Sequence, residues 1–392
     1  MHALDPRARA LLTWLRVIGW PSLAERTPAQ ARRDFRLLTA ATSRTPSGVR
    51  VRYGSIPGPA GRLPVRWYTP RTGRAPRPLL VWFHGGGFVV GDLFTADGTA
   101  RTLADRSGAV VLSVGYRLAP EHDCLAAVDD AWAALNWAAG HAGELGADPA
   151  RLVVGGESAG ATLSALVAQR ARPGGPALGL QVLVCPATDL ALGRLAILSG
   201  GAAPLLDRDV LDWFSGHFFA GHDPADPCLS PGRAADVAGV APALILTADW
   251  DLLRDDGEAY AERLDAAGVA VDHVRYPGQI HGFLAMDRIF PAAGRALDRV
   301  ATAVAAVSPA ATPSVADTTP SGAARWDGPA AEQATLTRER WLRTPIYGAA
   351  TAATTLLEHH TQRLARLTRS LALIMTDPAD GEPSAPTPGG PR

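Results

Sequence analysis

The chain contains no lysine, few cysteines and no excess of charge of either sign. All 38 basic residues among its 392 are arginine, and 38 acidic residues balance them. A balanced chain has no overall attraction for nucleic acid or for an anionic membrane, so we expect neither as a partner. Because 47% of the residues are hydrophobic and 19% charged, the chain can bury a sizeable core, which excludes general disorder.

The sequence also lacks the marks of export and of membrane insertion. Its three cysteines, Cys124, Cys185 and Cys228, have no short paired spacing, which excludes a disulfide or zinc framework and fits a reducing compartment. No uncharged run reaches the roughly 20 residues that span a bilayer. The first 20 residues carry Asp5 and arginines, so they lack the apolar core of a signal peptide. We therefore expect a cytoplasmic protein.

Three zones of the chain differ in composition and in the spacing of their apolar residues. Residues 1–45 combine apolar positions at helical spacing with Thr27-Pro28, a typical helix start, and predict two or three helices. Residues 46–307 alternate short β-branched runs with alanine-rich segments, which predicts an α/β domain with a mostly parallel sheet covered by helices. The expected strands are 79–83, 109–114, 152–154, 180–185, 244–247 and 269–276.

The third zone follows residue 307. Residues 308–334 are rich in Pro, Ser, Thr and Ala and predict a disordered linker, and the proline-rich residues 377–392 predict a disordered tail. Between them, 335–376 carries one apolar stripe at alternating spacings of four and three. We expect a helical extension that docks on its own catalytic domain, self-associates or binds another protein. Its arginines suit a membrane surface less well, because Glu358 lies among them.

The sharpest local motif is G-x-S-x-G, formed by Gly156, Glu157, Ser158, Ala159 and Gly160. It follows a predicted strand and precedes a predicted helix. In such a turn both glycines must be small, and the serine hydroxyl is exposed at the apex. The positive end of the following helix then faces any negative charge that forms on a substrate. We interpret Ser158 as a nucleophile rather than as a solvated serine in a glycine-rich connection.

A second glycine-rich turn, His84-Gly85-Gly86-Gly87-Phe88, comes directly after the strand expected at 79–83. Three consecutive glycines expose main-chain amides that no side chain obstructs, and a developing oxyanion needs such donors. No G-K-[ST] sequence follows, and no second glycine-rich loop with an acidic residue in register is present. Nucleotide binding is therefore not expected.

A serine nucleophile requires a base, and the base is usually oriented by a carboxylate. Of the ten histidines, His281 comes just after the last predicted strand, where the hydrolase order serine, acid, histidine places the base. The acid should follow the preceding strand. Asp249, Asp251, Asp255 and Asp256 all qualify by position, and spacing does not choose among them.

Five motifs in one order resemble the hormone-sensitive-lipase-like branch of the α/β-hydrolases, the bacterial family IV carboxylesterases. The resemblance covers residues 1 to about 305 and implies an α/β-hydrolase fold with a helical cap formed by residues 1–45 and by an insertion at about 190–225. The motifs are HGGGF, YRLAPEH, GESAG, DWDLLRDDGEAYAERL and GQIHGF.

The resemblance also assigns roles. It places the family's acid on Asp251, followed by Leu252 where the family usually has proline. It places the oxyanion donors on the amides of Gly86, Gly87 and Ala159. No metal or organic cofactor is implied.

Two departures from the family pattern lie near the expected site. Gly115 occupies the position of the usual Asp before Y-R-L-A-P-E, and Asp123-Cys124-Leu125 replaces a Pro-aromatic-Pro segment. Neither touches the expected triad, so they bear on loop geometry and substrate range.

These features predict a serine carboxylesterase that cleaves short- to medium-chain esters through an acyl-enzyme on Ser158. His281 acts as the general base, and Asp251 orients it. An acyltransferase or amidase would share the same acyl-enzyme. A hydrolase-fold protein that binds a small ligand without turnover is a further alternative, although such proteins generally lose the base or the nucleophile.

Overall fold

The computed structural model describes residues 2–309, apart from 74, 173, 194 and 197–202. The described residues all belong to the first of the two units into which the chain divides, Met1–Ser314. The predicted helical extension and disordered tail, and all but the first two residues of the predicted linker, lie outside the described residues.

The described residues form one eight-stranded sheet in the order β1-β2-β4-β3-β5-β6-β7-β8. Neighbouring strands from β4 to β8 along this order are parallel, whereas β1 with β2 and β2 with β4 are antiparallel. The predicted mostly parallel sheet is therefore confirmed. The strands are β1 Val49–Gly58, β2 Gly61–Pro70, β3 Arg77–Phe83, β4 Val110–Val114, β5 Ala147–Glu157, β6 Leu178–Val184, β7 Ala243–Trp250 and β8 Val271–Ile280.

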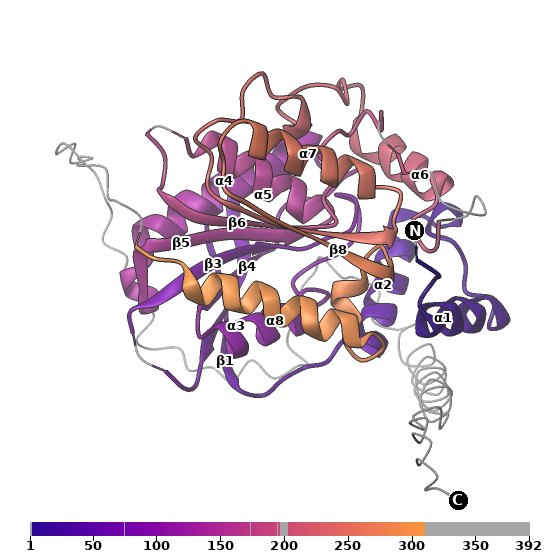
Figure 1. Cartoon of the computed structure of the whole chain (residues 1–392), viewed down its shortest axis with the longest axis horizontal. Helices are drawn as coiled ribbons and strands as arrows, with labels where there is room; N and C mark the ends of the chain where they lie inside the picture. The colour runs from indigo at the N-terminus through magenta and orange to yellow at the C-terminus, as the bar shows by residue number, and fades with distance from the viewer. Residues whose placement is uncertain (1, 74, 173, 194, 197–202, 310–392) are drawn as a thin grey trace, which may run out of the picture. The chain divides into compact units, whose positions relative to one another are not determined.

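The central strands are apolar on both faces because helices cover both. Residues 78–83 of β3 and all of β4 are buried. In Figure 1 the helices α3 and α8 cover one face of the sheet, and α4, α5 and α7 cover the other. These helices are α3 Asp97–Ser107, α4 Cys124–His141, α5 Ala159–Arg170, α7 Arg254–Ala266 and α8 Pro291–Ala306.

The structure contains a hairpin, formed by β1 and β2, that the sequence analysis did not predict. Only Val49 and Ile56 of β1 are buried, so this edge strand has no continuous apolar run. The available signal is weaker: Val49, Val51 and Tyr53 alternate with arginines before the turn sequence PGPAG. An edge strand with one solvated face shows alternation, and the search for apolar runs missed it.

The amino-terminal helices begin at well-formed caps. Asp5 accepts a hydrogen bond from the Arg7 amide at 2.8 Å where α1 (Pro6–Val17) begins. Thr27 and Gln30 form a reciprocal capping box at the start of α2 (Pro28–Thr42), as the Thr27-Pro28 pair predicts. A short 3₁₀ turn, η1 (Leu23–Glu25), lies between them. No helix in the described part of the chain has both the length and the apolarity that crossing a membrane requires.

Candidate active site

Ser158 lies at a sharp turn between β5 and α5. Its backbone has φ 55° and ψ −122°, a positive-φ conformation that is rare outside glycine. The Ser158 amide donates to the Val184 carbonyl at 2.8 Å, which holds the turn against β6. A Cβ at Gly160 would overlap the backbone of Phe83, and one at Gly156 would overlap Gly160. Both glycines are therefore required by close backbone approach.

The structure brings Ser158, His281 and Asp251 into one hydrogen-bonded chain. Ser158 Oγ lies 3.0 Å from His281 Nε2, and His281 Nδ1 lies 2.7 Å from Asp251 Oδ2. The other oxygen of Asp251 accepts from the Leu253 amide at 2.9 Å. His281 follows β8 and Asp251 follows β7, so adjacent parallel strands deliver both side chains to the same sheet edge. A proton can pass from the hydroxyl to the imidazole in this arrangement.

The four candidate aspartates have different partners in the tertiary structure. Asp249 accepts from the Gly278 amide at 3.0 Å and lies 2.9 Å from His2 Nδ1. Asp255 pairs with Arg254. Asp256 accepts from the Thr188 and Asp189 amides and from the Thr188 hydroxyl. Asp251 alone among these four contacts His281 in the described structure.

Two ionisable groups of the site have shifted pKa values. Burial by itself would lower the pKa of His281, but the charge and hydrogen bond of Asp251, together with the charge of Glu157, raise it above its ordinary value. Burial raises the pKa of Glu157 to about 7. Glu157 is 9% exposed, and its buried Oε1 has no hydrogen-bond partner among the described residues. A second carboxyl therefore faces the triad.

Cys185, directly after β6, is a neighbour of the triad that sequence reasoning did not single out. Its sulfur, an Asp251 oxygen and a ring nitrogen of His281 lie within 4.8 Å of one another. Burial, followed by the charges of Asp251 and Glu157, raises the pKa of this thiol well above its ordinary value. The thiol is therefore a neutral packing neighbour of Asp251.

The glycine-rich turn places free amides beside Ser158. Gly86 and Gly87 have φ values of 124° and 56°, and their amides, like that of Ala159, donate to no backbone carbonyl among the described residues. A Cβ at Gly85 would contact the Glu157 carbonyl at 3.0 Å, which shows how closely this turn approaches the serine turn. Three amide donors are therefore available next to the Ser158 hydroxyl.

His84 supports this turn and lies outside the reacting cluster. Burial lowers its pKa, its Nδ1 lies 2.9 Å from the Gly85 carbonyl, and its ring stacks on Tyr116 at a centroid distance of 4.3 Å. The Tyr116 hydroxyl donates to the His84 carbonyl at 2.7 Å. Tyr116, from the YRLAPEH motif, thus holds the glycine-rich turn in place through this hydrogen bond and the stacking of its ring on His84. Its neighbour Gly115 donates to the Pro64 carbonyl at 2.9 Å.

A cavity of about 500 Å³ opens onto Ser158 and His281. The amino-terminal helices α1 and α2 form one wall, and helix α6 (Arg208–Phe218) forms another. A Cβ at Gly87 would overlap the Phe214 ring, so α6 lies directly over the glycine turn. The cavity can take an apolar acyl or alcohol group. Its apolar lining includes Leu12, Leu15, Phe35, Leu38, Leu190, Leu206, Val210, Leu211, Phe214 and Phe218.

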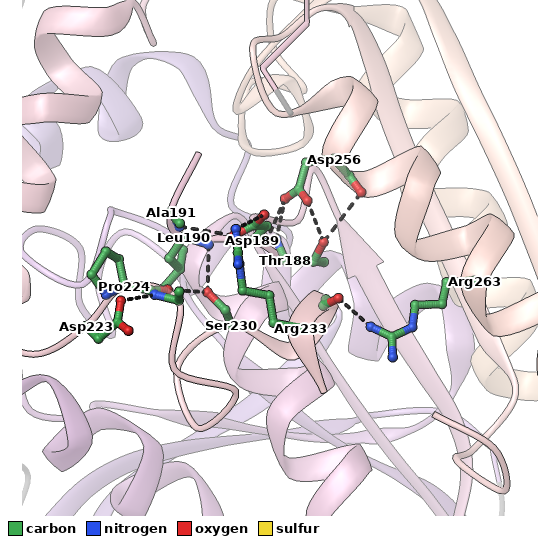
Figure 2. Close-up of polar contacts among 12 residues, drawn as sticks. Thr188, Asp189, Leu190, Ala191, Asp223, Pro224, Ser230, Arg233, Asp256 and Arg263 are labelled. Carbon is green, nitrogen blue, oxygen red and sulfur yellow. Dashed lines mark hydrogen bonds and ion pairs between the residues drawn. The ribbon is translucent and has the colours of Figure 1, made fainter. Parts of the chain in front are cut away.

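A polar network ties together the two ends of the segment between β6 and β7, which carries α6. Figure 2 shows Ser230 between Leu190 and Pro224: its Oγ accepts from the Leu190 amide at 2.8 Å and donates to the Pro224 carbonyl at 2.7 Å. Arg233 forms a two-point ion pair with Asp189 at 2.6 and 3.0 Å. From α7, Asp256 binds Thr188. We call these contacts the cap base; they hold the wall of the cavity in place.

Comparisons with known proteins agree with this architecture. A model of the α/β-hydrolase fold family matches residues 80–285. The chain is 46% identical over 294 residues to the carboxylic ester hydrolase LipN of Mycobacterium tuberculosis, covering 72% of this chain and 77% of that one. It is 38% identical over 247 residues to the ethyl acetate hydrolase of Pseudomonas putida, covering 62% of this chain and 78% of that one.

Solved structures of related enzymes share this fold. A hyperthermophilic esterase from the archaeon Pyrobaculum calidifontis superposes with a TM-score of 0.70 at 37% identity, over 77% of this chain and 98% of that one. An α/β-hydrolase from the metagenome of Lake Arreo in Spain superposes with a TM-score of 0.73 at 37% identity and the same coverage.

The sheet and the serine turn thus define an α/β-hydrolase, and the predicted fold class is confirmed. The chain belongs to the α/β-hydrolase fold family, in the branch that resembles hormone-sensitive lipase.

Proposed function

We propose that the chain, a carboxylic ester hydrolase, cleaves its substrates through an acyl-enzyme on Ser158. Relatives 46% identical to it are named carboxylic ester hydrolase and esterase. The single observation that supports this mechanism is the chain of contacts from Ser158 Oγ to His281 Nε2 and from His281 Nδ1 to Asp251, at 3.0 and 2.7 Å. This is the geometry that a serine nucleophile, its base and the orienting carboxylate require.

The proposed reaction has two halves. In the first, His281 takes the Ser158 proton while Oγ attacks the ester carbonyl, and the resulting imidazolium then protonates the leaving alcohol. In the second, His281 takes a proton from water, which attacks the acyl-enzyme; the imidazolium then returns that proton to Ser158 Oγ as the bond to the acyl group breaks and the carboxylic acid leaves. Asp251 keeps the Nδ1 proton in place and stabilises the imidazolium. The amides of Gly86, Gly87 and Ala159 donate to the oxyanion in both halves.

The proposed substrates are esters of short to medium acyl chains. The cavity of about 500 Å³ is largely apolar and is bounded by α1, α2 and α6, which limits the length of chain it holds. The name of the ethyl acetate hydrolase relative is consistent with small esters. A series of p-nitrophenyl esters from acetate to palmitate should therefore show the highest kcat/KM among the shorter members.

Fluorophosphonate labelling followed by peptide mass spectrometry tests the nucleophile. We expect one adduct, on Ser158, and complete loss of labelling in Ser158→Ala. That variant should also lose roughly 10⁴- to 10⁶-fold in kcat on a p-nitrophenyl ester. Ser47→Ala, at an exposed serine, is the matched control and should keep both labelling and turnover. An adduct elsewhere, or labelling of the Ser158→Ala variant, would refute the assignment.

We also propose a cytoplasmic location, because all three cysteines lie among the described residues and none forms a disulfide. Self-association or protein binding through residues 335–376 stays a prediction.

A further inference from the structure

A cluster of three metal-ligating side chains lies outside the triad, between α4 and the turn that follows α6. Asp123 caps α4, Cys124 is the first residue of that helix, and His222 comes from the turn after α6. The Cys124 sulfur, an Asp123 oxygen and a ring nitrogen of His222 all lie within 4.8 Å of one another. His222 Nε2 lies 2.7 Å from Asp123 Oδ2. Ninety-nine positions of chain separate these two residues, so only the fold brings them together.

The donor set suits a borderline-soft divalent cation. A thiolate, an imidazole and a carboxylate are the three ligand types that zinc prefers, with bonds of about 2.3, 2.0 and 2.1 Å. Tetrahedral ligands at those lengths lie roughly 3.3–3.7 Å apart, so the three atoms need only small rotamer adjustments. Three protein ligands leave a fourth position for water. Hard cations such as Mg²⁺ are disfavoured by the sulfur and the imidazole.

The backbone holds the three ligands in this arrangement. Asp123 Oδ1 accepts from the Leu125 amide at 2.9 Å, which orients the carboxylate so that Oδ2 faces His222 Nε2. On the other side the His222 amide donates to the Phe219 carbonyl at 2.8 Å. Ala220 and Gly221 both have positive φ, which closes the turn that presents the imidazole. These fixed backbone positions reduce the ordering that a metal ion would have to impose.

The three side chains differ in solvent exposure, as expected of a metal site that opens to solvent on one side. Cys124 is fully buried, whereas the Asp123 and His222 side chains are 53% and 35% exposed. A cation can therefore enter from the solvent side and meet the thiol beneath. A bound cation would take the place of the Cys124 thiol proton, which would pass to solvent.

We propose that Asp123, Cys124 and His222 form a Zn²⁺ site that links α4 to the cap segment carrying α6. An ion pair accounts for the contact of Asp123 with His222, and the Cys124 thiol, which hydrogen-bonds the Asp123 carboxylate, brings a third ligand type to the same place. These residues also occupy the place where the chain departs from the family pattern, with Asp123-Cys124 in place of proline and an aromatic residue. Because α6 carries Phe214 and Phe218 into the substrate cavity, bound Zn²⁺ would steady one wall of that cavity.

The other metal-ligating cluster found in the described residues, Cys185, Asp251 and His281, is the weaker candidate. There the imidazole and the carboxylate belong to the proposed triad, and Cys185 and Asp251 are almost fully buried, whereas Asp123 and His222 are partly exposed. A cation at either cluster would replace a 2.7 Å contact between an imidazole and a carboxylate, but only at the triad does that contact orient the base. Metal at the triad would also abolish esterase activity, which separates the two sites experimentally.

The test uses the untagged full-length protein, stripped of metal with a chelator and titrated with Co²⁺. A thiolate ligand gives a sulfur-to-cobalt charge-transfer band that histidine-only sites cannot produce. We expect one Co²⁺ per chain with this band, displaced by one equivalent of Zn²⁺, and esterase activity within twofold of the metal-free enzyme. Cys124→Ser should lose the band, His222→Gln should bind at least tenfold more weakly, and the matched control Cys228→Ser should behave as wild type.

Three outcomes would overturn the proposal. The band could persist in Cys124→Ser, it could be absent from the wild type at millimolar Co²⁺, or it could depend on Cys185 and coincide with stoichiometric loss of activity. If the buried Cys124→Ser change prevents folding, His222→Gln on the half-exposed turn decides the matter alone. As a second measurement, Zn²⁺ should raise the Tm of the wild type and of Cys228→Ser by more than it raises that of His222→Gln.

Discussion

At the scale of single residues, several strained backbone conformations lie close together at the candidate site. Phe88, Ser158 and Cys185, all non-glycine, have positive φ values of 61°, 55° and 46° and lie around the same cluster. Each such residue costs on the order of 1–3 kcal/mol and persists only where its surroundings enforce it. Here the amides of Ser158 and Cys185 donate to β6 and β7 at 2.8 and 2.7 Å. The sheet thereby holds the half-buried nucleophile at the apex of its turn.

The Glu157 carboxylate should influence the pH dependence of the reaction. The charge of its carboxylate favours the His281 imidazolium and so raises the pKa of the base. Replacing Glu157 by Gln removes that charge, so the pKa of His281 falls. Since only the neutral imidazole accepts the Ser158 proton, the acidic limb of the kcat/KM profile should move to lower pH. The measurement is kcat/KM for a p-nitrophenyl ester between pH 5 and 9.

Glu144→Gln, at an exposed glutamate, is the matched control and should leave the acidic limb in place. A limb that stays fixed in Glu157→Gln, or that moves to higher pH, would show that Glu157 does not influence the base. In the wild type the limb reports Glu157 and His281 together, because the two groups titrate as a coupled pair.

At the scale of elements, the cap base determines where the cavity wall lies. The segment between β6 and β7 leaves the sheet at Thr188 and returns near Ser230, and its two ends are bound to each other and to α7 (Figure 2). Arg263 on α7 donates to the carbonyls of Gly232 and Ala234. Helix α6 is therefore attached to the catalytic domain by backbone and side-chain hydrogen bonds rather than by apolar packing alone.

Ser230→Ala tests this attachment. Ser230 is fully buried, and removing its hydroxyl leaves the Leu190 amide and the Pro224 carbonyl without their partner. Each such loss costs about 1–3 kcal/mol, so the free energy of unfolding should fall by at least about 1 kcal/mol. Urea unfolding measures the change. The exposed Ser47→Ala should stay within about 0.5 kcal/mol of wild type, and equal stability of the two variants would contradict the role of Ser230.

At the scale of the whole molecule, every group of the candidate site lies in the first compact unit. The triad, the glycine turn and the described cavity lining all fall within Met1–Ser314. The end of α8 belongs to this unit as well: Arg151 donates to the carbonyls of Val307 and Ala305 at 2.7 and 2.8 Å. The position of the cut therefore matters in any truncation.

A chain ending at residue 314 should keep kcat/KM within about twofold of the full-length protein, because it retains all these groups. A chain ending at residue 300 serves as the contrast. It loses the Arg151 contacts and the buried Val304, so it should unfold at a lower temperature. Ester hydrolysis, thermal melting and light scattering measure the outcome. Loss of activity in the longer truncation would place part of the function beyond residue 314.

Sequence patterns located the parallel strands and the two glycine-rich turns, because each is a local property of the chain. A strand buried on both faces is largely apolar, as residues 78–83 of β3 and all of β4 except Ser113 are, and a turn with close backbone approach must use glycine, as at Gly156 and Gly160. The edge hairpin was missed because half of its surface is solvated. The cap insertion at about 190–225, which contains α6, came from the family resemblance alone, since a spacing of four shows an apolar face but not what that face covers.

The sequence by itself determined the α/β class, the serine turn and the position of the histidine. The choice of Asp251 over Asp249, Asp255 and Asp256 was left to family resemblance, and only the tertiary structure places its carboxylate on His281. The same holds for His222, which meets Cys124 only when the cap segment folds back over α4. Hydrogen-bond partners distant in sequence depend on strand order and loop path, and spacing along the chain carries neither.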